Sequence, residues 1–370
     1  MNRRRFLSCL CGAPALGAAS LAASGLPSPA AGQMLFMTSD LSRTAAPVWQ
    51  AWKAGYLQPD GRVVDRLQQN SSHSEGQGYG MVLAVEFDDR EAFAAMFDWT
   101  ERHLALRSDA LLAWRYLPDA GERVPDRNNA SDGDLFYAWA LMRAARRFTD
   151  RRYLERATDI AQALAAHCIR PSPEDPARLL LLPAVQGFVH DRRVTVNPSY
   201  LMPLAMNELA AATGVQELAQ CARDGEALLA RLAQDGLVPD WVAISPDGIA
   251  PAHDFSQNAG YEAMRVPLFL LWSGLATHPA ITQMQRVYEQ TVRPGAAVPT
   301  VIEPTSGVVI EGSDDPGYRA LAATITCAGR GGEAGSDMPA FDPRQPYYPA
   351  TLQMFAMIAV NEVVQQCIPI

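Results

Sequence analysis

The 370-residue sequence lacks the motifs of several common hydrolytic chemistries. Its histidines form no His-x-x-x-His pair, so a zinc hydrolase is not indicated. No Gly-x-Ser-x-Gly segment is present to form the nucleophile elbow of a serine esterase. These absences disfavour a zinc hydrolase and a serine esterase.

Paired cysteines and long apolar runs are also scarce. Cys168, Cys221, Cys327 and Cys367 are far apart with no Cys-x-x-Cys spacing, which argues against a zinc knuckle or a dense disulfide framework and leaves one bridge open. After the first thirty residues no run of 18 or more apolar residues occurs. The mature chain is therefore predicted to have no membrane-spanning helix.

The first 31 residues have the pattern of an export signal. Arg3, Arg4 and Arg5 form a positive head, an Ala/Leu/Gly-rich stretch follows, and small residues near Ala30 and Ala31 offer a cleavage site. The order Arg-Arg-Phe-Leu resembles a twin-arginine signal. An uncleaved anchor is the alternative, but the apolar run is short and rich in small residues. We expect a periplasmic or secreted protein.

The charge balance excludes several kinds of partner. The formal net charge is -9, and it becomes -12 once the three arginines of the signal are removed. An acidic surface disfavours nucleic acid and anionic membrane. A neutral partner is therefore expected.

The remaining chain, residues 32–370, has a helical pattern. Apolar residues recur at helical spacing in about eleven segments, most of them 12 to 19 residues long, as at Phe93, Phe97, Thr100 and Leu104. Short β-like segments lie between them. We predict hairpins at 241–250, at 112–121 and at 298–307, because turn residues such as Ser245-Pro246-Asp247-Gly248 separate or follow the apolar stretches. Without a Pro/Ser-rich linker, one domain is the simpler interpretation.

The first acidic cluster is Ser74-Glu75-Gly76-Gln77-Gly78-Tyr79-Gly80-Met81. Ser74 is a good N-cap, which would place Glu75 in the first turn of a helix. The alternating glycines permit close approach of a ligand or of another backbone. They do not have the spacing of a dinucleotide loop, and no Walker lysine follows.

The second cluster is Asn128-Asn129-Ala130-Ser131-Asp132-Gly133-Asp134, and a helical pattern follows it directly. A calcium loop is disfavoured because the glutamate of an EF-hand is missing. Taken alone, the cluster is equally well explained as a helix cap formed by Ser131 or Asp132.

Asn258 to Pro267 is the third cluster, with Glu262 and Arg265 at i and i+3. By itself this pair would be read as a surface ion pair that stabilises little. The neighbouring Tyr261 and the two other acidic clusters make a site the better interpretation.

These segments together resemble family 8 of the glycoside hydrolases. Ala130 to Asp134, continuing through Ala138, Ala140, Leu141, Ala144 and Phe148, is similar to the family signature. The segment Ser74–Met81 resembles its general-acid motif, and Asn197-Pro198-Ser199-Tyr200 resembles a further family segment. The motifs occur in the family's order over most of the mature chain. Within the family, the chain resembles the periplasmic endoglucanases that accompany bacterial cellulose synthesis.

The resemblance implies an all-α (α/α)6 barrel with a substrate cleft where the inner helices begin. It implies that Glu75 is the proton donor and that Asp132 grips the sugar at the cleavage point. Glu262 falls where many members carry the catalytic-base aspartate, and Arg265 matches the arginine of that segment. Two departures are Tyr137, in place of an aliphatic residue, and Glu262, which puts the identity of the base in question.

Physical chemistry sets conditions on these roles. The leaving oxygen of a glucan needs a proton, so one carboxyl must stay protonated near neutral pH. A helix N-terminus favours the ionised form, so we expect Asp132 to lie close to Glu75 and oppose that effect by like charge. Inversion requires acid and base carboxyls ~6.5–9.5 Å apart, and a glutamate base could misplace the water by about 1 Å.

A neutral polymer is best gripped by aromatic rings. The candidates for sugar contact are Trp114, Tyr116, Tyr200, Tyr261 and Trp241, while Trp139 is better read as a core residue. Asn197, Arg265 and Asp134 complete the predicted substrate-binding set. Tyr200 is also a candidate for holding the attacking water, as the family segment suggests.

The expected activity is an inverting endo-1,4-β-glucanase acting on cellulose, with the cellulose export machinery as a further partner. A chitosanase, xylanase or mixed-linkage glucanase of the same family is one alternative. A weakly active or non-catalytic glucan-binding accessory protein is another, favoured only by Glu262. A lyase on a related barrel is a weaker one, because acidic polymers would be repelled.

Overall fold

The computed structural model describes residue 41, residues 43–330 and residues 335–369. The predicted signal over residues 1–31 therefore lies outside the described residues. Within the described ranges, none of the helices is both long and apolar enough to cross a membrane.

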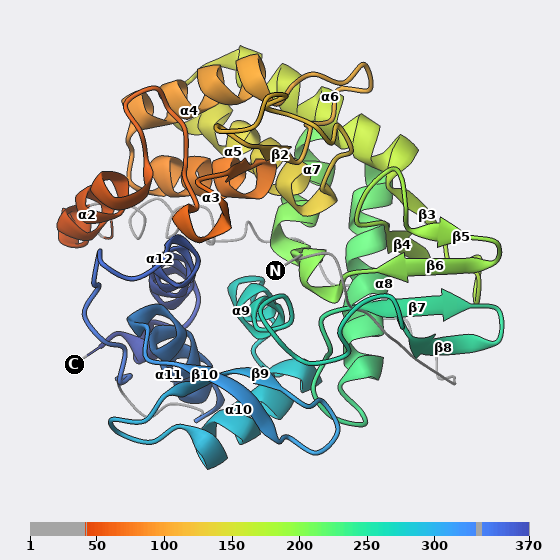
Figure 1. The fold of residues 1–370 in the computed structure, drawn as a ribbon, viewed down its shortest axis with the longest axis vertical. Helices are drawn as coiled ribbons and strands as arrows, with labels where there is room; N and C mark the ends of the chain where they lie inside the picture. The colour runs from red at the N-terminus through yellow and green to blue at the C-terminus, as the bar shows by residue number, and fades with distance from the viewer. Residues whose placement is uncertain (1–40, 42, 331–334, 370) are drawn as a thin grey trace, which may run out of the picture.

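Helices in two concentric layers make up the molecule (Figure 1). The inner helices are α3 (Ser74–Glu86), α5 (Ser131–Arg147), α7 (Pro203–Thr213), α9 (Arg265–Trp272) and α12 (Tyr347–Glu362). Around them lie α2 (Ala46–Tyr56), α4 (Arg90–His103), α6 (Arg151–His167), α8 (Gln216–Leu232), α10 (Pro279–Thr291) and α11 (Pro316–Gly329). The predicted (α/α)6 barrel class is confirmed. The described helices are 8 to 17 residues long, whereas the sequence predicted 12 to 19 residues for most of them.

Residue pattern decides which layer a helix joins. Every residue of α3 and of α9 is buried, so these helices need apolar or internally paired side chains on all faces. The outer helix α6 buries Ile160 and Leu164 but exposes Arg151 and Arg152. An amphipathic helix of this kind can cover the inner ring with one face and meet water with the other.

Two glycines bring the inner helices α3 and α5 into close contact. A Cβ on Gly133 would lie 2.2 Å from Ser74 Oγ and 2.6 Å from the Glu75 nitrogen. A Cβ on Gly78 would lie 2.8 Å from the Tyr137 nitrogen. Only glycine permits this separation, which places the first turns of the two helices side by side.

Short strands occupy the connections between helices. A four-stranded antiparallel sheet contains β5 (Val189–His190), β6 (Arg193–Val196), β7 (Val242–Ser245) and β8 (Gly248–Pro251). Two further pairs are β3 (Ile169–Pro171) with β4 (Leu179–Leu181), and β9 (Val298–Ile302) with β10 (Val309–Ser313). Single 3-10 turns lie at Arg66–Gln68, Pro198–Tyr200 and Gln365–Cys367. The hairpins predicted at 241–250 and 298–307 are confirmed.

The hairpin predicted at 112–121 is wrong. Its strand β2 (Arg115–Tyr116) pairs instead with β1 (Ser72–His73), which lies far earlier in the chain. The Ser74 nitrogen also donates to the Trp114 carbonyl at 3.0 Å. The turn at 118–121 does form, but the partner strand comes from the entrance to α3. This long-range pairing attaches Trp114 to the residues that precede Glu75.

The end of the barrel opposite Glu75 holds a separate buried ion cluster. Arg143 of α5 donates to Glu86, the last residue of α3, and to Glu208 of α7 at 3.0 Å. Its Nη1 lies 3.7 Å from an oxygen of Glu362, at the end of α12. Trp139 donates to Glu208, which places this tryptophan in the core as predicted.

Cys327 and Cys367 form the disulfide that the sequence left open, linking α11 to the chain that follows α12. Cys168 and Cys221 are buried free thiols. Tyr137, the departure from the family signature, donates to Glu101 at 2.8 Å, and Glu101 in turn pairs with Arg156. The substitution therefore adds a polar link from α5 to the outer layer.

Candidate active site

Three chain segments converge where the inner helices begin. Glu75 lies in the first turn of α3, and Asp132 lies in the first turn of α5. Glu262 lies in the turn directly before α9, whose first residue is Arg265. The structure therefore brings together the residues of all three acidic clusters.

The helix caps differ from the predicted ones. His73 is the N-cap of α3 and Ala130 is the N-cap of α5, and neither caps with its side chain. Asp132 Oδ1 accepts from its neighbour Gly133 at 2.8 Å. Ser74 is part of the helix, so its hydroxyl is buried against α5 and cannot cap. The tight α3–α5 contact outweighs the local preference for a serine cap.

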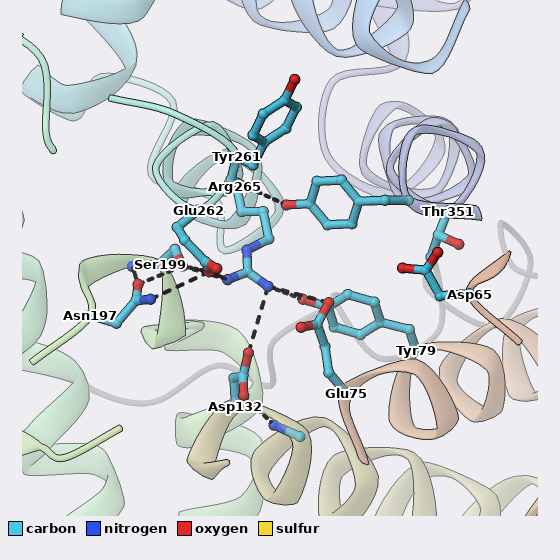
Figure 2. Close-up of polar contacts among 12 residues, drawn as sticks. Asp65, Glu75, Tyr79, Asp132, Asn197, Ser199, Tyr261, Glu262, Arg265 and Thr351 are labelled. Atoms are coloured by element: carbon cyan, nitrogen blue, oxygen red, sulfur yellow. Dashed lines mark hydrogen bonds and ion pairs between the residues drawn. The ribbon is translucent and has the colours of Figure 1, made fainter. Parts of the chain in front are cut away.

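Arg265 is the centre of the site. Its Nη1 lies 3.5 Å from Glu75 Oε1 and 3.6 Å from Asp132 Oδ2, while Nη2 donates to Glu262 Oε2. Figure 2 shows the guanidinium between Glu262 on one side and Glu75 and Asp132 on the other. Arg265 is only 1% exposed, so one buried cation is shared by three carboxylates. This is not the surface ion pair that the spacing alone would suggest.

Uncharged groups fix the orientation of this cation and of Glu262. Arg265 Nη1 donates to the Tyr79 hydroxyl at 2.9 Å, and Nη2 donates to Ser199 Oγ at 2.6 Å. Asn197 Nδ2 donates to Glu262 Oε2 at 3.3 Å. The planar guanidinium presents several N–H groups in a fixed fork, which suits it to holding several acceptors at once.

Three carboxylates with one guanidinium leave excess negative charge inside the protein. Burial raises the pKa of Asp132 well above its ordinary value, and the negative charge of Glu75 adds to this, while Arg265 opposes it. Asp132 is 2% exposed. Like charges in a low-dielectric site favour retention of a proton by the group. The predicted proximity of Asp132 and Glu75 is confirmed by their contacts with the same Nη1 atom.

A cleft opens over these acids. Its lining combines the three acids with amide and aromatic side chains. The lining residues are His73, Ser74, Glu75, Trp114, Asn128, Asn129, Ala130, Asp132, Pro183, Ala184, Phe188, Tyr200, Trp241 and Glu262. Among the described residues, no group of three or more His, Cys, Asp or Glu side chains is arranged to hold a metal ion.

Three of the predicted aromatic contacts line this cleft. Trp114 stacks on His73 at 6.0 Å between ring centroids, and its indole N–H donates to Asp126. Tyr200 lies over the Arg265 guanidinium at 5.8 Å and edge-on to Trp241. Trp114 therefore lies beside the segment that precedes Glu75, and Tyr200 lies beside Arg265.

Other predicted contact residues lie outside the cleft lining. Tyr116 is buried against Trp99, and its hydroxyl accepts from Arg123. Tyr261 packs near Tyr318, points away from the acids in Figure 2, and donates to Glu311. Neither ring is among the residues that line the cleft.

Asp134 also lies behind the cleft. Its oxygens accept from the Leu112 nitrogen at 2.8 Å and from Asn129 Nδ2 at 2.9 Å. Burial raises the pKa of Asp134 to about 7. In this structure Asp134 holds Asn129 and the segment leading to Trp114, and it is not among the residues that line the cleft.

Sequence reasoning missed several residues that the site uses. Tyr79 follows Glu75 by four residues, so helical spacing could have placed it on the same face. His73 adjoins the acid motif. Asp240 lies 22 residues before Glu262 and carried no local signal. Its carboxylate contacts the Glu262 turn only through the tertiary fold.

The model of the family "Glycosyl hydrolases family 8" matches residues 28–362. An endoglucanase from Cellulomonas uda is 36% identical over 231 residues, which is 62% of this chain and 64% of that protein. A probable endoglucanase from Novacetimonas hansenii is 32% identical over 86% of this chain and 91% of its own length.

A solved structure shares the architecture. A family 8 endo-β-1,4-glucanase from an Achatina fulica gut metagenomic library superposes with a TM-score of 0.77 and 32% identity, covering 85% of this chain and 97% of that chain. The resemblance drawn from three short motifs thus extends over most of the fold.

Proposed function

Because this chain belongs to family 8 of the glycosyl hydrolases, we propose that it is an endo-1,4-β-glucanase that cleaves cellulose by the inverting single displacement of its family. The observation that carries the proposal is the contact of Glu75, Asp132 and Glu262 with one buried guanidinium beneath an aromatic cleft. The reaction needs no cofactor.

Glu75 is proposed as the proton donor. It lies at the cleft, and the glycosidic oxygen leaves as an alcohol only if a carboxyl protonates it. Asp132 shares the Nη1 atom of Arg265 with Glu75, so the two acids can hold one proton between them more easily than both can ionise. Asp132 is also placed to bind the sugar at the cleavage point.

Glu262 is proposed as the base that activates water. Its Oε2 accepts from Arg265, Asn197 and Ser199, which fix the orientation of the carboxylate. The opposite oxygen is then the one to receive the water proton. Glu75 and Glu262 contact different nitrogens of the guanidinium. In the proposed displacement the sugar and the attacking water bind between these two acids.

The aromatic rings supply the grip on a neutral chain. Pyranose C–H groups pack on ring faces, so Trp114, Tyr200 and Trp241 are proposed to hold successive glucose units across the acids. Asn197 acts indirectly by fixing Glu262.

The test is release of reducing ends from carboxymethyl-cellulose. Glu75→Gln and Glu262→Gln should each lower turnover by at least about 100-fold. Glu91→Gln is the matched control, because Glu91 lies in the first turn of the outer helix α4 and is exposed. Near-normal turnover of Glu262→Gln, with Glu75→Gln inactive, would place the base elsewhere. The initial product observed by NMR should be the α-anomer.

Release of reducing ends also tests the two alternative functions, a non-catalytic accessory protein and a family member with another substrate. A non-catalytic glucan-binding accessory is favoured only by glutamate at the base position, and measurable turnover abolished by Glu75→Gln excludes it. A panel of chitosan, xylan and mixed-linkage glucan separates cellulase activity from the other family specificities.

We propose that the protein works in the periplasm or outside the cell. The bridge between Cys327 and Cys367 supports this, because disulfides persist in oxidising compartments. Fractionation of cells should find the oxidised protein outside the cytoplasm, and a reduced, cytoplasmic pool would contradict export. Association with the cellulose export machinery is a further proposal, tested by co-purification with the synthase.

A further inference from the structure

Asp240 lies directly behind the turn that carries Glu262. Its Oδ1 accepts three backbone N–H groups, from Gly260 at 2.8 Å, Glu262 at 3.1 Å and Ala263 at 2.7 Å. Asp240 is 5% exposed and is not among the residues that line the cleft. It therefore contacts the backbone of Glu262 without being placed to contact a substrate.

Other contacts also hold the turn, among them the hydroxyl of Tyr348, which donates to the Tyr261 carbonyl. Ala259 pairs with Ile302 of β9 before the turn, and the regular helix begins only at Arg265. Between these points, three N–H groups converge on one carboxylate oxygen. Buried N–H groups need acceptors, so removing this oxygen leaves the turn free to shift.

Gly260 provides an independent indication that the fit is tight. A Cβ at this position would lie 2.6 Å from Asp240 Oδ2. The carboxylate thus sits against the Gly260 backbone with no room for a side chain. A change at Gly260 should disturb the same contact from the opposite side.

We propose that Asp240 is a positioning residue for the catalytic base: its Oδ1 holds residues 260–263 so that the Glu262 carboxylate faces the acid across the cleft. This inference rests on the proposed role of Glu262. Misplacement of a reacting group by about 1 Å can lower a rate by roughly 100-fold. A glutamate has one more rotatable bond than an aspartate, so its backbone must be held firmly.

The acceptor oxygen matters more here than a full negative charge. Burial raises the pKa of Asp240 to about 8, and the neighbouring Glu262 carboxylate adds to the shift. An asparagine presents the same carbonyl oxygen and can accept the same N–H groups. Asp240→Asn is therefore the conservative variant and Asp240→Ala is the disruptive one.

The experiment compares turnover and KM of these variants on cello-oligosaccharides. Asp240→Ala should lower kcat about 100-fold with KM within about threefold, because the stacked Trp241 ring is held separately by Phe188 and Phe255. Asp240→Asn should stay within about tenfold of the parent. Gly260→Ala should reproduce the loss in kcat. Gly121→Ala should not, since an added Cβ there meets no atom within 4 Å.

Leaving-group dependence shows which carboxyl is affected. A 2,4-dinitrophenyl cellobioside needs little protonation, so it should restore the rate of Glu75→Gln towards that of the parent. It should not restore Asp240→Ala if that variant has lost base positioning. Asp89→Asn, which alters the N-cap of α4, controls for a general loss of stability.

Three results would overturn the positioning role. These are a kcat of Asp240→Ala within threefold of the parent, an equal loss in Asp240→Asn, or recovery of Asp240→Ala on the activated substrate. Failure of the base assignment can be distinguished from failure of the positioning role. An active Glu262→Gln variant would refute Glu262 as the base, independently of the kinetics of the Asp240 variants.

Discussion

At the scale of single residues, the shared guanidinium of Arg265 explains how three acids can occupy one buried site. Breaking a buried ion pair on one side leaves an uncompensated charge, which costs about 3–5 kcal/mol. Arg265 avoids that cost for Glu262 and moderates it for Glu75 and Asp132. The remaining excess of negative charge is what keeps a proton in the site.

Arg265→Lys tests whether charge alone is sufficient. A lysine keeps the charge but lacks the planar fork, so it cannot serve the Nη1 and Nη2 acceptors together. We expect kcat on carboxymethyl-cellulose to fall at least about 100-fold. Arg147→Lys, in a half-exposed pair with Asp88, should be neutral. Activity of Arg265→Lys within tenfold of the parent would mean that the fork is dispensable.

At the scale of elements, the active site depends on two helix N-termini that nearly touch. Glycines at the α3–α5 crossing permit this, and the strand pairing of β1 with β2 adds the Trp114 wall. The local sequence of each helix predicts neither the α3–α5 crossing nor the pairing of β1 with β2. The contact between the N-termini of α3 and α5 therefore decides that Glu75 and Asp132 lie together and which residues cap the two helices.

Gly133→Ala should separate these helices. Its Cβ would meet Ser74 Oγ and the Glu75 nitrogen well inside contact distance, so α3 or α5 must move. We expect a loss of about 1–3 kcal/mol in unfolding free energy and a larger proportional loss of kcat. Denaturant unfolding and steady-state kinetics measure the two effects, with Gly121→Ala as the control. Unchanged stability and turnover would show that the helices yield without cost.

At the scale of the whole molecule, each end of the barrel carries a cluster of three acids about one arginine. The cleft end holds three acids about Arg265, and the opposite end holds Glu86, Glu208 and Glu362 about Arg143. Burial, and then the charge of Glu86, raises the pKa of Glu362 to about 7. The folded state therefore retains a proton on Glu362 that the unfolded chain releases at lower pH.

The sign of the resulting pH dependence follows from linkage. Stability from this group is fully present below the unfolded pKa of about 4.5 and is lost as pH rises through about 7. Glu362→Gln keeps an acceptor for Trp272 and removes the titration. The free energy of unfolding of Glu362→Gln should equal that of the parent at pH 4.5. At pH 8 it should exceed that of the parent by on the order of 1–3 kcal/mol.

Thermal unfolding at both pH values measures this difference. The exposed Glu289→Gln should show no such pH-dependent gain. A Glu362→Gln protein less stable than the parent at pH 8 would mean that the ionised carboxylate is needed by Arg143.

The sequence by itself determined the helical class, two of three hairpins and the three segments that carry the acids. These are local properties: apolar periodicity, turn chemistry and motif spacing act within a few residues of one another. The same reasoning anticipated the proximity of Asp132 and Glu75, because a buried acid needs a neighbour to hold its proton.

Tertiary structure alone decided which side chains line the cleft and which support it. Tyr116, Tyr261 and Asp134 are aromatic or acidic in the right segments, yet they lie outside the cleft lining. Asp240 carried no local signal, and it holds the site through contacts made only in the folded chain. The physical reason is that orientation depends on contacts between elements far apart in the chain, and those contacts have no local pattern.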